Sequence, residues 1–193
     1  MIVITAPAAE PVTLADVRTQ LGILTADTAS DTTITRRIIE ARQYAERRQR
    51  RALITQTLQV RMDSFPCEFV LPNPPAASVS WVKYVNTDGV LTTVTATDYE
   101  LDTYPLHAVV RPAYGVSWPV PRDESNAVRV QWVAGYGVDG TFVPASTREA
   151  IMLLVGHWMN FQPRIENGQF ITRIPPAIDQ LLDLDTADNL LLT

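Results

Sequence analysis

Few side chains in this sequence have the type and spacing that a catalytic or metal site needs. His107 and His157 have no His, Cys or Glu partner at a spacing typical of metal ligands, so we interpret both as structural or surface residues. Cys67, the single cysteine, begins a predicted strand, which favours a buried or inert thiol over a nucleophile. There is no Gly-x-Ser-x-Gly motif and no phosphate-binding loop. The sequence therefore predicts no catalytic residue, no metal and no cofactor, and it argues against an enzyme.

Two further patterns allow both a functional and a structural interpretation. The run GYGVDG, residues 135–140, is rich in glycine but has no helix directly behind it, which favours a flexible turn over a nucleotide cradle. Asp98, Glu100 and Asp102 alternate on one face of a predicted strand. Three carboxylates there could bind a cation or serve a carbohydrate-acting enzyme, but the pattern favours a solvated face.

Positive charge is concentrated at the end of a predicted helix. Four arginines fall within residues 47–51, where the helix dipole stabilises one or two exposed cations by about 0.3–1 kcal/mol each. Four such charges repel one another, so a phosphate or a carboxylate is expected nearby, and arginine binds either group through its planar fork. A nucleic-acid site, a subunit contact and a solvated helix end all remain open. We call Arg36, Arg47, Arg48, Arg50 and Arg51 the arginine cluster.

The distribution of charge argues against a generally basic nucleic-acid binder. The chain carries a formal charge of −5, yet residues 36–51 hold seven Arg and only two Glu. The stretch from Asp179 onward holds four Asp and no basic residue. No aromatic residue is interleaved within 47–51, and no groove-reading motif is present. This asymmetry indicates charge pairing between segments of the chain or between subunits.

Three leucines, Leu190, Leu191 and Leu192, lie directly before the final residue, and a monomer gains little from them, because termini fray unless they are tied down. Two interpretations remain open. The segment either folds back on the core of its own chain or docks into another chain.

Periodicity predicts helices near both ends of the sequence. Capping boxes at Thr13–Asp16 and Ser146–Glu149 mark two helix starts. The predicted helices cover residues 13–21, about 31–51, a third segment that ends at Pro163, and 176 to about 184. The apolar stripe of the second helix is Ile34, Ile38, Ala41 and Ala45.

Between these helices the hydrophobic residues recur at every second position instead of at the helical spacing. This alternation predicts an antiparallel sheet or small sandwich of about 80 residues. The predicted strands are 54–62, 67–71, 78–85, 90–94, 98–102, 107–111 and 127–133.

The predicted fold class is therefore α+β. A helical lobe of about four helices is built from both chain ends, residues 1–52 and 144–193, and residues 53–143 form an inserted antiparallel β lobe. With 193 residues, such a chain needs no disulfide or metal to hold a core. The N-terminus lacks the features of a signal peptide, and no window approaches the 18 uncharged apolar residues of a membrane span.

Several segments then occur in a familiar order. They are VTLADVRTQLGI, ITRRIIEARQYAERRQRRALITQTLQVRMDSFP, FVLPNPPAASVSWVKY, VRVQWVAGYG, VPASTREAIMLLVGHWMNF and IPPAIDQLL, and they span about residues 12 to 184. This order resembles the head–tail connector (adaptor) proteins of tailed bacteriophages, in particular the subgroup with a β insertion. The most specific part is RALITQT after the second helix, combined with AGYG and VP before the third.

The resemblance implies a structural role. Members of that family form a ring, typically of twelve subunits, under the portal vertex, where the ring extends the DNA channel and docks neck or tail proteins. The implied partners are sister copies, the portal protein, a downstream neck or tail protein, and packaged DNA that passes without sequence-specific recognition. The implied location is the virion neck, after synthesis in the host bacterial cytoplasm, with no membrane contact.

The resemblance also suggests roles for particular residues. The arginine cluster is expected at a subunit or partner contact, with the DNA channel as the second choice. The C-terminal segment departs from the family pattern, because it lacks a basic residue at the end of the last helix and adds an acidic, leucine-ending tail. The alternative function is a nucleic-acid-binding accessory protein that uses the basic helix Arg36–Arg51. The residues expected to dock on the portal or another partner are Ile178, Leu181, Leu182, Leu190, Leu191 and Leu192.

Overall fold

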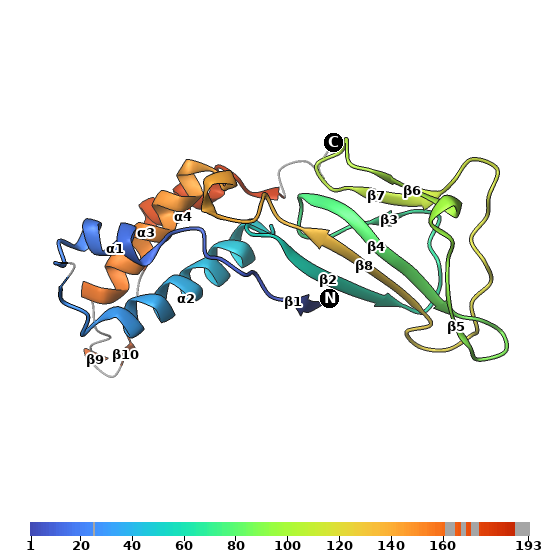
Figure 1. The fold of residues 1–193 in the computed structure, drawn as a ribbon, viewed down its shortest axis with the longest axis horizontal. Helices are drawn as coiled ribbons and strands as arrows, with labels where there is room; N and C mark the ends of the chain where they lie inside the picture. Colours follow the sequence, from blue (N-terminus) through green and yellow to red (C-terminus); the bar gives the residue numbers. More distant parts are fainter. Residues whose placement is uncertain (25, 161–164, 167–168, 171–173, 188–193) are drawn as a thin grey trace. The chain divides into compact units, whose positions relative to one another are not determined.

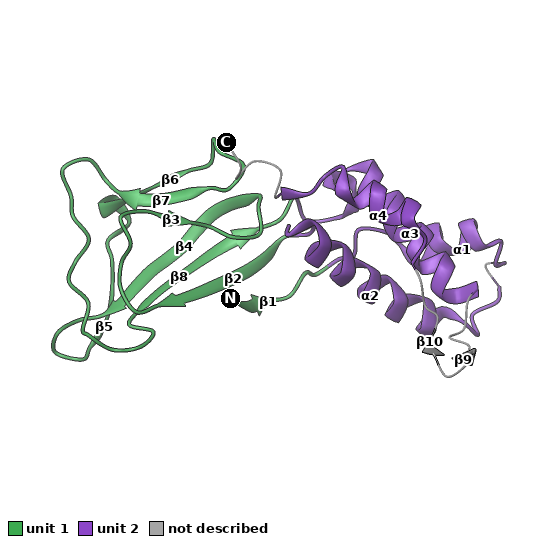
Figure 2. Ribbon diagram, turned by 180° about the vertical axis from the view of Figure 1, so that it is seen from behind, with its two compact units in different colours: residues 1–8, 55–136 green, residues 9–54, 137–193 purple. Residues whose placement is uncertain are grey.

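The chain forms two compact units, shown in Figure 2: a β unit of residues 1–8 and 55–136, and a helical unit of residues 9–54 and 137–193. The computed structural model describes the chain apart from residues 25, 161–164, 167–168, 171–173 and 188–193. Residues 1–8, which the sequence-based division assigned to the helical lobe, belong to the β unit.

Four α-helices build the described part of the helical unit (Figure 1). Their bounds are α1 Leu14–Leu21, α2 Asp31–Gln49, α3 Ala145–Asn160 and α4 Pro176–Asp183. The shorter elements are the 3₁₀ turn η2 Gly140–Phe142 and the paired strands β9 Ile165–Glu166 and β10 Gln169–Phe170. Helix α2 packs against α3, and α4 packs against both. The expected apolar stripe of α2 faces this core, since Ala41 and Ala45 are fully buried and Ile38 is only 3% exposed.

Local capping explains where two of the helices begin. The predicted capping box of α1 is confirmed, because Thr13 Oγ1 accepts from the Asp16 amide (3.1 Å) and the Asp16 carboxylate accepts from the Thr13 amide (3.0 Å). The second predicted capping box is wrong. Helix α3 begins at Ala145, so Ser146 lies inside its first turn, and the Ser146 hydroxyl donates to Asp185 instead of capping the helix.

The β unit contains two antiparallel sheets, of order β1-β2-β8-β4-β5 and β3-β7-β6. The strands of the larger sheet are β1 Ile2–Thr5, β2 Gln56–Met62, β4 Ala76–Val85, β5 Leu91–Thr93 and β8 Val128–Ala134. Those of the smaller sheet are β3 Phe69–Val70, β6 Tyr99–Asp102, after the 3₁₀ turn η1 Ala96–Asp98, and β7 Val109–Pro112. Every predicted strand has a counterpart whose ends lie within two residues of the prediction.

Aromatic side chains join the two sheets into one core. Phe65 stacks on Trp118, with ring centroids 4.8 Å apart, and meets Tyr84 of β4 edge to face at 5.8 Å. Phe69 of β3 packs on the same Trp118 ring at 5.4 Å. Trp132 of β8 is fully buried. In Figures 1 and 2 the strands of the smaller sheet lie beside β4.

The predicted fold class is confirmed: the chain is α+β, with the four described α-helices in one unit and the five-stranded and three-stranded antiparallel sheets in the other. Strand β1 was not predicted, and it adds an edge strand to the larger sheet by pairing with β2. Among the described helices, none is both long and apolar enough to cross a bilayer.

Candidate subunit and partner interface

The arginine cluster lies where α2 ends and the chain turns toward the first long strand. Arg50 adopts the left-handed conformation, φ 52°, and its amide donates to the Glu46 carbonyl, which closes the helix. Arg47 and Arg48 occupy the last helical turn, where their charges interact favourably with the helix dipole. The helix dipole thus accounts for these two arginines, and the remaining positive charge requires other partners.

Arg48 finds its partner on α4 of the same chain. Its Nε and one terminal nitrogen donate to the two carboxylate oxygens of Asp183, each at 2.8 Å, in a bidentate pair. The hydrogen bonds from Arg48 hold the pKa of the Asp183 carboxyl below its ordinary value. Both side chains are more than 40% exposed, so water and salt screen the pair and its contribution to stability is small.

The Arg48–Asp183 pair makes the free energy of unfolding depend on pH. Because the pKa of Asp183 is lowered in the folded chain, the stabilisation by the pair is present above the unfolded carboxyl pKa of about 3.9 and is lost as the pH falls through the lower folded value. Asp183→Asn is therefore expected to lower the free energy of unfolding slightly at pH 7, and by progressively less as the pH falls below about 3.9. Urea titrations of both proteins at several pH values measure this difference, and a constant difference across the range would contradict the assignment.

Further contacts join the residues that follow α4 to Arg51, beyond the end of α2, and to the start of α3. Arg51 Nε donates to the Asp185 carbonyl at 2.5 Å. The Asp185 carboxylate accepts from the hydroxyls of Ser146 and Thr147 at the start of α3. The acidic C-terminal region therefore supplies partners to the arginine cluster within one chain, in addition to any that a neighbouring subunit provides.

A buried amide reinforces the same junction. Gln49, the last residue of α2, is fully buried, and its Nε2 donates to Thr147 Oγ1 (2.8 Å) and to the Leu182 carbonyl (2.9 Å). Tyr44 donates its hydroxyl proton to Asp179 at 2.8 Å, and burial of the ring raises the pKa of Tyr44. Helix α4 is thus held on α2 by polar contacts along its length.

The other members of the arginine cluster face solvent. Arg36 and Arg47 are exposed, and neither forms an ion pair with any residue that the structure describes. Arg50 is exposed as well. The structure thus separates the cluster into Arg48 and Arg51, which bind α4 or the residues that follow it, and a group on the outside of α2 that is accessible to a partner.

The predicted docking residues of the C-terminal segment also separate into groups. Ile178 is 3% exposed and Leu182 is fully buried, so both belong to the core of the helical unit. Leu181 is half-buried. Leu190, Leu191 and Leu192 lie outside the described residues.

Sequence reasoning missed the ion pairs of Arg42. Arg42 is 7% exposed and donates to Glu10 (2.8 Å) and to Glu46 (2.9 Å), while a second oxygen of Glu46 accepts from the Leu53 amide. The pair with Glu46 has the helical i, i+4 spacing and was readable from the sequence. The pair with Glu10 joins residues 32 positions apart, and no local pattern indicates it.

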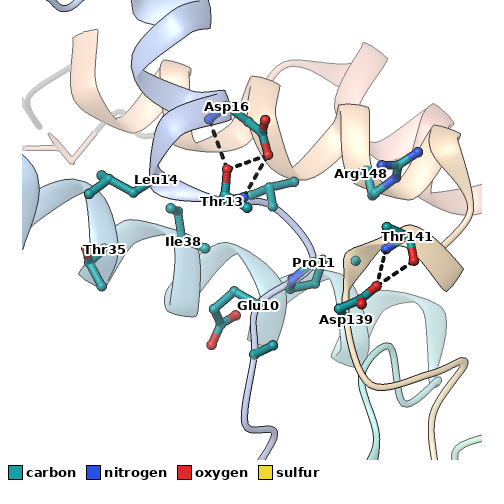
Figure 3. A pocket seen from close by; sticks show the side chains of 13 residues that line it. Glu10, Pro11, Thr13, Leu14, Asp16, Thr35, Ile38, Asp139, Thr141 and Arg148 are labelled. Atoms are coloured by element: carbon teal, nitrogen blue, oxygen red, sulfur yellow. Dashed lines mark hydrogen bonds between the residues drawn. The ribbon is translucent and has the colours of Figure 1, made fainter. Parts of the chain in front are cut away.

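A cavity of about 490 Å³ in the helical unit is a candidate for a small-molecule site (Figure 3). Its three carboxylates already have partners: Glu10 pairs with Arg42, Asp16 caps α1, and Asp139 accepts from Thr141. Hydrogen bonds from the Thr13 and Thr141 hydroxyls lower the pKa values of Asp16 and Asp139, which makes both weak bases at neutral pH. The cavity is lined by residues 9–14, Asp16, Thr35, Ile38, 139–141 and Arg148.

The glycine-rich run 135–140 has a packing role in this region. Gly140 lies so close to the Pro11 carbonyl that a Cβ there would overlap it, so the position requires glycine. The run leads through a bend into η2, which begins at Gly140.

The remaining reactive residues do not converge on one site. His107 and His157 lie in different units, and Cys67 is exposed, which contradicts the buried alternative of the expected buried or inert thiol. Asp98 ends η1 rather than joining the strand, so only Glu100 and Asp102 share a face of β6. No group of three or more His, Cys, Asp or Glu residues in the described part of the chain is placed to hold a metal ion.

Comparison with known proteins gives a match of fold rather than of sequence. No protein-family model matches the sequence, and no curated protein matches it. A chain from "Neck of empty GTA particle computed with C6 symmetry" has a TM-score of 0.78 at 20% identity, over 100% of this chain and 99% of that chain. A chain from "Virion of native gene transfer agent (GTA) particle" has a TM-score of 0.78 at 21% identity, over 100% of this chain and 97% of that chain. A chain from "Neck of native GTA particle computed with C12 symmetry" has a TM-score of 0.72 at 19% identity, over 100% of this chain and 99% of that chain.

At these identities the comparison establishes a shared fold. The match extends over both units, because it covers this entire chain and nearly all of each chain that it resembles. The combination of a helical unit with an inserted sandwich is therefore found as a whole in structures described as particle necks or virions.

Proposed function

We propose that this chain is a structural subunit of the neck of a tailed phage or phage-like particle. The observation that carries the proposal is the fold shared over the full chain length with chains from gene transfer agent particles. In this role the chain forms a ring under the portal, extends the DNA channel and offers a docking surface to a neck or tail protein. The cyclic symmetries named for the similar necks, C6 and C12, support a ring of copies.

The contacts made by the carboxylates of the cavity in Figure 3 support a structural role over an enzymatic one. The carboxylates that line the cavity are used in an ion pair and in helix caps, so none is available as a general base. The alternative, a nucleic-acid-binding accessory protein that uses the arginine cluster, has less support, because Arg48 and Arg51 bind groups of their own chain.

Within the neck, we assign the arginines on the exposed side of α2 to a contact with a neighbouring subunit or partner. Arg36 and Arg47 are accessible and have no ion-pair partner in the described part of the chain. For the portal contact we assign Leu181 and the three terminal leucines. Ile178 and Leu182 support that contact indirectly, because their burial holds α4 in place.

Imaging of particles from cells that express this chain tests the proposal. Electron microscopy of the purified necks is expected to show density that fits the chain in a closed ring next to the portal. Particles that assemble with intact necks but lack this chain, by imaging and by mass spectrometry, would refute the neck assignment.

Removing the last five residues tests the terminal contact. Deletion of Asn189–Thr193 is expected to leave the melting temperature of the isolated chain unchanged, since α4 is held by Gln49 and Arg48, and to reduce co-purification with the portal. A large fall in the melting temperature would instead show that the terminal leucines belong to the core of their own chain.

A further inference from the structure

The larger sheet of the β unit carries a row of three cations across three neighbouring strands. In the antiparallel register Arg61 of β2 lies directly opposite Arg129 of β8, and Arg129 lies directly opposite Lys83 of β4. Residues directly opposite each other share a face of the sheet, and adjacent strands are about 4.8 Å apart. Three positive charges therefore lie in a line about 10 Å long.

The row lies on the outer face of the sheet. Leu58, Trp132 and Val82, which are at most 1% exposed, alternate with the cations along β2, β8 and β4 and point to the opposite, inner face. Arg61 is exposed, and Lys83 and Arg129 are half-buried. We call Arg61, Lys83 and Arg129 the basic row.

No negative charge accompanies the basic row on its sheet. The five strands of the larger sheet contain no Asp or Glu, and the basic row comprises all of their Lys and Arg residues. The eight acidic residues of the β unit lie instead in loops, in η1 and on β6 of the smaller sheet. The outer face is thus positive although the whole chain is acidic.

The basic row is not neutralised within the chain. None of its three members forms an ion pair with a described residue, and the buried Nε of Arg129 has no hydrogen-bond partner. Like charges directly opposite each other on a sheet are destabilising. The basic row therefore lowers the stability of the chain and has no counter-charge within it. This is expected if the counter-charge is supplied by another molecule.

The residues beside the basic row indicate which kind of anion binds it. In the next row on the same face, Trp81 lies opposite Gln131, and both side chains are half-buried, whereas Gln59, opposite Gln131 on β2, is only 6% exposed. The Lys83 ammonium lies 4.6 Å from the centroid of the Trp81 ring. Lysine and arginine beside an aromatic ring and amide groups are typical of sheet surfaces that bind nucleic acid, where cations contact phosphates and aromatic and amide groups contact sugars and bases.

We propose that the outer face of the larger sheet binds the phosphate backbone of DNA through Arg61, Lys83 and Arg129. Three phosphate contacts give weak binding without sequence preference, which would allow DNA to move past the surface. The proposal goes beyond the neck role, and it uses a different surface from the arginine cluster of α2.

Salt dependence is the sharpest test, and it needs no assembled particle. Binding of the full chain to a fluorescent DNA duplex, measured by anisotropy from about 20 mM salt upward, is expected to give a slope of log K against log salt of about −2.7. This slope corresponds to about a 40-fold loss of affinity between 50 and 200 mM salt. Arg129→Gln is expected to make the slope less steep by about 0.9, and replacement of all three residues by Gln to abolish binding.

Two matched controls remove the same charge elsewhere. Arg111→Gln removes an exposed arginine of the smaller sheet that pairs with Glu100, and it is expected to leave the slope unchanged. Arg36→Gln with Arg47→Gln tests α2, and a change of slope in this variant but not in Arg129→Gln would overturn the proposal. The melting temperature of Arg129→Gln is expected to be no lower than that of the unmodified chain, because repulsion within the row is relieved, so lost binding cannot be attributed to unfolding.

Two other results would also overturn the proposal. One is no binding of the unmodified chain to the duplex at the lowest salt concentration. The other is a triple variant that binds DNA normally but no longer enters particles, because the anion would then be a carboxylate surface of a protein partner. The neck assignment is decided separately by imaging, so either conclusion can fail without the other.

Discussion

Replacing Gln49 by glutamate is expected to lower the free energy of unfolding of the helical unit by about 4 kcal/mol at pH 7. The Gln49 side chain is fully buried, and its amide nitrogen donates to the Thr147 hydroxyl and to the Leu182 carbonyl. Gln49→Glu replaces this donor by an oxygen that faces the Leu182 carbonyl, and it buries a negative charge that neither contact neutralises. Urea unfolding followed by far-ultraviolet circular dichroism measures the loss.

The loss is expected to depend on pH with a definite sign. Burial raises the pKa of the introduced carboxyl in the folded chain above its unfolded value of about 4.3. Below that value both states are protonated and the loss is smallest. As the pH rises toward 7 the unfolded state releases its proton first, so the variant loses up to about 1.4 kcal/mol per pH unit relative to the original chain.

Gln49→Met separates the effect of charge from that of the lost hydrogen bonds. The methionine side chain has a similar length and no charge, and the Thr147 hydroxyl and the Leu182 carbonyl retain other partners in Asp185 and Thr186. Gln49→Met is therefore expected to lose about 1–2 kcal/mol, independently of pH. Equal losses for the glutamate and methionine variants at pH 7 would show that the site is more hydrated than the structure indicates.

The helices and strands of this chain were largely predictable because its hydrophobic periods are clear. The stripe Ile34, Ile38, Ala41 and Ala45 repeats at the helical spacing and is buried along α2. The alternation of β8 is equally regular, with Val128, Val130 and Trp132 buried and their neighbours more exposed. Strand β1 was missed because Ile2, Val3 and Ile4 form a short apolar run without alternation, and its strand character comes from pairing with the distant β2.

The charge pattern was readable from the sequence, but its pairing was not. The sequence shows an arginine-rich segment and an acidic C-terminal segment, which indicates that they pair. It does not show that Arg48 reaches Asp183, 135 residues away, within the same chain, because that contact depends on how α4 packs against α2. The basic row was not predictable for a related reason. Arg61, Lys83 and Arg129 are isolated charges in the sequence, and only the strand register brings them into one line.

The arginine cluster and the basic row affect the stability of the chain in different ways. Arg48 and Arg51 stabilise the helical unit through contacts with α4 or the residues that follow it. The basic row has no such internal compensation, so its cost is best explained by a function. A charge that stabilises its own chain needs no partner, which is why the basic row, rather than the longer arginine-rich segment, carries our inference about DNA.

Removing Arg42 is expected to be the second large perturbation, with a loss of about 3 kcal/mol in the free energy of unfolding. Arg42 is buried between Glu10 and Glu46, with donor–acceptor distances of 2.8 and 2.9 Å. Arg42→Ala leaves two partly buried carboxylates close together without a cation, and it also removes the packing of the long side chain. A fall in the melting temperature of roughly 6–12 °C is expected for a chain of this size.

Two comparisons identify the cause of that loss. Arg37→Ala removes an arginine of the same helix that forms an exposed pair with Glu40 and lies over the Trp158 ring, and it is expected to cost at most about 1 kcal/mol. Combining Arg42→Met with Glu10→Gln and Glu46→Gln removes the unpaired charges while it retains an apolar stem and an acceptor for the Leu53 amide, so it is expected to recover more than half of the stability. If this triple variant is as unstable as Arg42→Ala, packing rather than charge holds this part of α2, and the two carboxylates are less buried than their contacts indicate.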